Sequence, residues 1–203
     1  MVPRHSDLRR VFVVLAAAGC VLIVASGPVR GEQRRINAVA RTEQNFLKRV
    51  AAYLQLHKKL EASLPKLPRD ATPPQIDQNQ RALAALVADA RKDAKPGDLF
   101  TPDMQRLVHR LFADVFKGKA GQDAIKYIHD EAHPVTPEIN KRYPDTIPLS
   151  TMPLRVLADL PKLPDSLEYR FVDRHLILMD VQAHIILDYV LNAIPPAPSR
   201  GRD

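Results

Sequence analysis

Residues 167–180 read LEYRFVDRHLILMD, and this stretch decides the fold class. Apolar and polar residues alternate over 167–172, which is the period of a strand with one buried face. A second apolar run covers 175–180, after the pair Asp173-Arg174. The pattern predicts an antiparallel hairpin closed by a two-residue turn.

Residues 183–194 either add a third strand, which would make a small meander, or form a final helix. Ile185, Leu187 and Tyr189 recur at every second position, and this alternation favours the strand. We therefore assign residues 165–194 to a C-terminal β-hairpin or meander, and we expect the tail, 195–203, to be disordered.

Upstream of the strands, residues 35–139 have helical periodicity. The longest predicted helix covers 35–64, with apolar or aromatic residues spaced alternately by four and three at Phe46, Val50, Tyr53, His57, Leu60 and Leu64. Such a stripe usually packs within its own domain, and the alternative is a homodimer or another protein partner along 35–64. On this stripe we expect His57 to be a hydrogen-bonded core or boundary residue rather than a ligand.

Three shorter helices are predicted at 74–94, 102–118 and 122–132. Thr101 is a suitable N-cap, with Pro102 at the first helical position.

Five prolines between residues 140 and 164 exclude long helices and central strands there. We expect this proline-rich segment to wrap over the helices in extended form. The predicted fold class is therefore α+β and mainly α: one domain with a bundle of about four helices over 35–139, the wrap over 140–164, and the small antiparallel hairpin or meander.

The N-terminus has the pattern of an export signal. Three arginines precede an uncharged apolar run, 11–25, which Ser26, Gly27 and Pro28 then break. We predict a signal peptide at 1–26 and hence a periplasmic or secreted protein. The alternatives are an uncleaved inner-membrane anchor, the one case in which we expect membrane attachment, and a lipoprotein modified at Cys20.

Composition excludes several classes of protein. Cys20 is the single cysteine, so cleavage would leave no thiol for a disulfide, a metal or a nucleophile. Three of the 30 Lys and Arg and one of the 23 Asp and Glu lie in 1–26, so the remainder carries a net charge of +5. Basic residues are spread along the helices without interleaved aromatics, which argues against nucleic-acid binding.

The candidate metal ligands are His129 and His133, which lie four residues apart and therefore on one helix face. A cationic histidine that stabilises a helix C-terminus explains the same pair. Asp173, Asp180 and Asp188 punctuate the predicted strands, and we expect these carboxylates to be solvated. We identify no catalytic residues and no cofactor-binding motif.

The C-terminal residues resemble a pattern in small exported bacterial proteins, including the periplasmic nickel/cobalt-homeostasis (RcnB-like) proteins. The matching segments are 163–164, 169–172, 176–180 and 185–188. The whole chain after the signal also resembles an uncharacterised family of exported bacterial proteins that share the segment 97–102, GDLFTP. These resemblances imply an envelope location and a hairpin module, and they carry over no catalytic residues.

The function expected from the sequence is that of an exported, non-enzymatic interaction or structural protein. One alternative is a metal-binding or metal-responsive envelope protein that uses His129 and His133. Another is a hydrolase whose site is assembled from residues far apart in the sequence.

Overall fold

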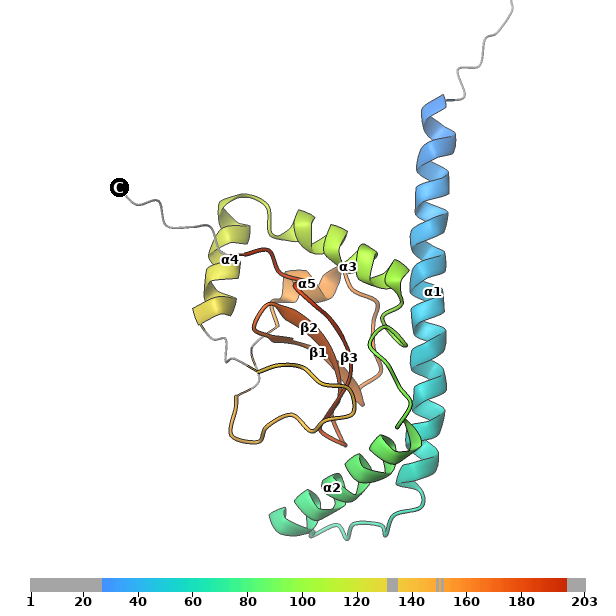
Figure 1. Cartoon of the computed structure of the whole chain (residues 1–203), viewed down its shortest axis with the longest axis vertical. Coiled ribbons are helices and arrows are strands. Elements are labelled where there is room, and N and C mark those ends of the chain that lie inside the picture. Colours follow the sequence, from blue (N-terminus) through green and yellow to red (C-terminus); the bar gives the residue numbers. More distant parts are fainter. Residues whose placement is uncertain (1–26, 131–134, 149, 151, 197–203) are drawn as a thin grey trace, which may run out of the picture.

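The computed structural model describes residues 27–130, 135–148, 150 and 152–196. The elements in these ranges are α1 (Gly27–Glu61), α2 (Pro73–Ala90), α3 (Pro102–Val115), α4 (Gly118–Asp130), α5 (Leu154–Ala158), β1 (Leu167–Val172), β2 (His175–Asp180) and β3 (Ile185–Val190). Figure 1 shows a small central sheet with α1 along one flank of the molecule. The predicted fold class, mainly helical with a small antiparallel sheet, is confirmed. Within the described ranges, no helix is both long enough and apolar enough to cross a membrane.

The first helix is anchored by its C-terminal half. Phe46, Val50, Tyr53 and His57 are buried, and their spacing places them on one side of α1. From residue 31 to residue 45, by contrast, every side chain is exposed or half-buried. We name this N-terminal part the arm: Val39 in its middle packs against the core, and its first turns extend beyond the body of the molecule (Figure 1).

A side-chain cap and a close glycine contact determine how helices α3 and α4 begin. The Thr101 side chain accepts the Met104 N–H at 3.4 Å, so the predicted N-cap of α3 is confirmed. Helix α4 begins at Gly118 rather than at the expected residue 122. A Cβ on Gly121 would lie 2.2 Å from the Phe116 carbonyl carbon. Close packing against the end of α3 therefore requires a glycine inside α4.

The three strands form one antiparallel sheet in the order β1-β2-β3. Val172 pairs with His175, so the predicted two-residue turn is confirmed, and Asp173 has a positive φ of 50°. The third strand is confirmed as well, because residues 185–190 pair with β2 with a register shift at Leu178/Met179.

Both faces of the sheet are covered. The larger core cluster contains Leu176 and Leu178 of β2 together with the buried residues of the helices. Ile177 and Met179 point to the opposite face and pack with Tyr143 in a second cluster. Residues 135–148 lie over this opposite face of the sheet. The backbone of this segment also pairs with β3, since the Asn140 N–H donates to the Ile186 carbonyl at 2.8 Å.

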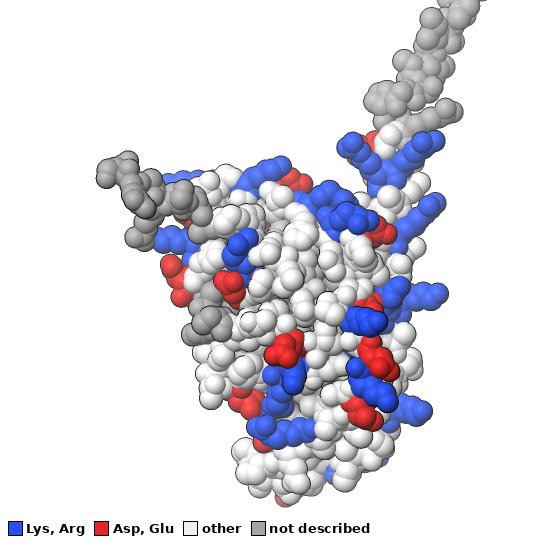
Figure 2. Space-filling view, viewed as in Figure 1, with Lys and Arg blue, Asp and Glu red and all other residues white. Residues whose placement is uncertain are grey.

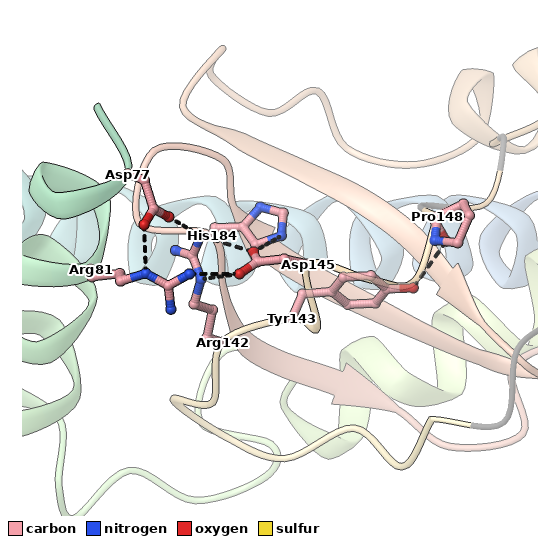
Figure 3. A network of polar contacts seen from close by, with 7 residues as sticks. All are labelled: Asp77, Arg81, Arg142, Tyr143, Asp145, Pro148 and His184. Carbon is pink, nitrogen blue, oxygen red and sulfur yellow. Dashed lines mark hydrogen bonds and ion pairs between the residues drawn. The ribbon is translucent and has the colours of Figure 1, made fainter. Parts of the chain in front are cut away.

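A network of charged side chains connects the same segment to α2 (Figure 3). Arg81 of α2 contacts Asp77 and Asp145, each at 2.8 Å, and Arg142 contacts Asp145 at 2.9 Å. The His184 ring lies 3.8 Å from Asp145. Because Asp77, Arg81 and Asp145 are about half exposed, each pair contributes little to stability. Together the pairs set the position of residues 142–145 between α2 and the β2–β3 turn.

Candidate functional site

Asp180 ends β2 and is fully buried. Its carboxylate accepts hydrogen bonds from the Tyr53 hydroxyl, from His57 Nδ1 at 2.6 Å and from the Ala183 N–H at 2.7 Å. Tyr53 and His57 lie one turn apart on the buried side of α1. The cluster therefore joins α1 to the end of β2 across more than 120 residues of sequence.

The pKa values of the two α1 side chains shift in ways that favour this arrangement. The hydrogen bond to Asp180 raises the pKa of His57, and burial opposes this only in part. Burial raises the pKa of Tyr53 far above its ordinary value, and the Asp180 charge raises it further. The raised pKa of His57 favours its protonated form beside Asp180, and the raised pKa of Tyr53 favours a neutral hydroxyl donor.

Asp188 in β3 is a second fully buried carboxylate. One of its oxygens accepts the N–H groups of Leu99 and Phe100, both at 2.7 Å. The other accepts the Gly97 N–H at 3.0 Å and the N–H of the adjacent Tyr189 at 2.8 Å. Burial raises the pKa of Asp188, and the four N–H donors oppose this rise. Asp188 therefore determines the conformation of the loop before α3.

The expectation that Asp180 and Asp188 are solvated is wrong. Each is shielded from water and compensated by three or four donors, which is what burial of a carboxylate requires. Asp173, in the β1–β2 turn, has a side chain that is 43% exposed. His57 has the position expected of it, buried and hydrogen-bonded, since its Nε2 lies 3.1 Å from Gln182 Oε1.

Arg91 completes the polar core between α1 and the sheet. Its guanidinium carbon lies 5.3 Å from the centre of the Tyr53 ring. The same group donates to Asn140 Oδ1 at 3.0 Å and to the Leu187 carbonyl at 2.9 Å. Burial lowers the pKa of Arg91. The nearby charges of Asp180 and Asp188 act in the opposite direction and favour the cation.

An open hollow of about 520 Å³ lies beside the Asp180 cluster. Its lining contains Lys58, Glu61, Asn79 and Gln182 together with residues 64–67. Gln182 separates His57 from this hollow, since one end of its amide faces His57 Nε2 and the other donates to Glu61 at 2.7 Å. A molecule in the hollow would therefore meet lysines, amides and one carboxylate, a set suited to binding polar groups.

A second hollow, of about 440 Å³, lies along β1. Its charged lining residues include Glu168 and Arg170, which form an ion pair at 2.6 Å. The pentapeptide Leu-Pro-Lys-Leu-Pro occurs at 64–68 and at 160–164, and each copy contributes to the lining of one of the two hollows. Of the described residues lining these two hollows, no two form a carboxylate pair, and none is a histidine.

The predicted metal ligands are only partly placed. His129 lies at the end of α4 with its Nδ1 4.0 Å from Asp173 Oδ1. Its Nε2 is buried and has no hydrogen-bond partner among the described residues. His133 lies outside those residues, as do the predicted signal peptide and most of the predicted tail. Within the described ranges, no group of three or more His, Cys, Asp or Glu residues is arranged to hold a metal ion.

Comparison of the chain with protein-family models, curated proteins and solved structures finds no match. The resemblance of the C-terminal hairpin to exported bacterial proteins therefore stays a prediction.

We predict that His57→Gln lowers the free energy of unfolding by about 3 kcal/mol near pH 6, because it leaves the buried Asp180 charge without its partner. The folded-state pKa of His57 is raised, so its contribution is fully present below the unfolded pKa and is lost as the pH rises through the folded pKa. The deficit of the variant should therefore shrink towards pH 9. Urea titrations at several pH values measure it, with the exposed His109→Gln as the matched control. A deficit that does not change with pH would contradict the ion pair.

Asp188→Asn should destabilise the protein by about 3 kcal/mol, because the amide NH2 would face two backbone N–H donors that lose their acceptor. Asp93→Asn, at an exposed aspartate just before the same loop, is the control and should cost much less. Chemical denaturation of both variants gives the comparison. Equal losses would mean that Asp188 does not fix the loop.

Proposed function

We propose that this chain is an exported, envelope-associated protein that works by binding rather than by catalysis, with the arm as its contact element. An export signal at 1–26 would deliver the protein to the envelope, and the arm follows closely in sequence. The helical body would then act as a rigid platform that holds the arm in place.

The arm is the observation that carries this proposal. Residues 31–45 extend α1 by about 22 Å, yet contain no buried side chain. An isolated helix of this length is only marginally stable in water. The arm therefore adds little to the stability of the fold. Extended helices of this kind are typical of elements that bind a partner or keep two parts of an assembly apart.

The polar groups of the core support binding over catalysis. Asp180, Asp188 and His57 are the chain's buried charged side chains among the described residues. Each is held by hydrogen bonds that connect chain segments distant in sequence. Groups used in this way stabilise the body and are shielded from molecules in the hollows.

The proposal predicts that the protein contacts its partner in the cell through the arm. A photo-cross-linking residue in place of Ala38, which is exposed, should give discrete adducts with an envelope protein or a phospholipid. The same residue in place of Leu154, 84% exposed on α5, is the control and should give none.

Export is tested separately. A phosphatase fused after residue 203 should be active only when residues 1–26 are present. An inactive full-length fusion refutes export, and an absence of adducts at position 38 refutes the arm as the contact element.

A second candidate function, metal binding, is supported by the buried Nε2 of His129, which has no partner among the described residues. Titration of the protein with Ni²⁺ or Zn²⁺ should then release heat, and His129→Ala and His133→Ala should each abolish most of it. His109→Ala removes an exposed histidine elsewhere and serves as the control. A titration without heat eliminates this candidate.

A further inference from the structure

The outer side of α1 carries an aligned row of basic residues. At about 100° per residue, four of them lie within roughly 40° of one another around the helix axis, and they are Arg34, Arg41, Lys48 and Lys59. The row extends for about 37 Å, at 1.5 Å per residue. It lies opposite the buried side that contains Phe46 and His57.

These four cations have no acidic partner in the part of the chain that the structure describes. All are exposed, and none has an ion-pair or hydrogen-bond partner among the described residues. The acidic residues of α1 are Glu32, Glu43 and Glu61, which lie roughly 140° to 180° away from the members of the row. The outer side of the helix therefore carries charge of one sign over both the arm and the anchored half.

The shape of the molecule leaves this row accessible to a flat surface. Figure 1 shows α1 as a straight helix on the outer flank of the body, with the sheet and the other helices on one side of it. In Figure 2, Lys and Arg side chains project outward along that flank. A plane can therefore contact the whole row without meeting the body.

We infer that the outer side of α1 binds anionic phospholipid headgroups, so that α1 lies along a membrane surface with the body facing away. Basic side chains on a helix are attracted to anionic lipid, and here they meet the headgroups in a line. The sequence favours lipid over other polyanions in the uncleaved chain, because the uncharged apolar run 11–25 ends two residues before α1 begins and would hold the helix at a membrane. The inference deepens the proposed function and rests on the envelope location it assigns.

The test is acetylation of lysines in the full chain with vesicles of phosphatidylglycerol and phosphatidylcholine in equal parts, and with vesicles of phosphatidylcholine alone. Lys48 and Lys59 should react at least about fivefold more slowly with the anionic vesicles. Lys92 and Lys119, exposed elsewhere on the same molecules, provide the internal control and should keep their rates. Equal rates for Lys48 and Lys59 in both kinds of vesicle would overturn the inference.

Charge variants give a second measurement. The double variant Arg34→Gln/Arg41→Gln should bind anionic vesicles roughly 25-fold more weakly, because each arginine contributes a factor of about five to the affinity. Arg69→Gln with Arg155→Gln, two exposed arginines outside α1, removes the same charge and should change binding much less. Equal losses, or protection of the row by soluble polyphosphate but not by vesicles, would refute lipid binding. A protein adduct at position 38 without vesicle protection would also refute it, while the proposed function would stand.

Discussion

The burial of two carboxylates in a three-stranded sheet is the constraint on which the rest of the structure depends. A buried carboxylate needs several donors, and β2 and β3 cannot supply them all. Asp180 obtains them from α1 and the β2–β3 turn, and Asp188 mainly from the loop at residues 97–100. Each carboxylate thus connects a strand to an element about 90 or more residues away in the chain.

These connections place the aromatic core. The loop held by Asp188 contains Phe100, whose ring stacks on Phe46 with 5.3 Å between centroids and lies 6.3 Å from the Tyr169 ring of β1. The Phe46–Phe100 contact fixes α1 about two turns before Tyr53, the first of its residues to reach Asp180. Two separate attachments along α1 therefore set both its direction and its rotation about its own axis.

Features that depend on local periodicity could be predicted from the sequence, and features that depend on distant partners could not. The hairpin, the third strand and the Thr101 cap each follow from a short run of residues, and all three are confirmed. The burial of Asp180 and Asp188 was missed because their donors are backbone groups or side chains far away in sequence. The sequence does mark the loop at 97–102, because this segment carries the resemblance to the uncharacterised exported family. Nothing in the segment, however, indicates that an aspartate 88 residues after Phe100 accepts its N–H groups.

The basic row could not be recognised from composition either, because neutral and acidic residues and further basic ones, such as Arg35 and Arg49, separate its members in the sequence. It becomes a single surface only once the buried side of α1 is known. The same helix geometry that brings Phe46, Val50, Tyr53 and His57 to the core sends Arg34, Arg41, Lys48 and Lys59 to the opposite side. Since Asp180 and the Phe46–Phe100 stack fix the rotation of α1, they also fix the direction in which the row points. A change that freed α1 from the sheet would leave every charge of the row in place and still remove its alignment relative to the body.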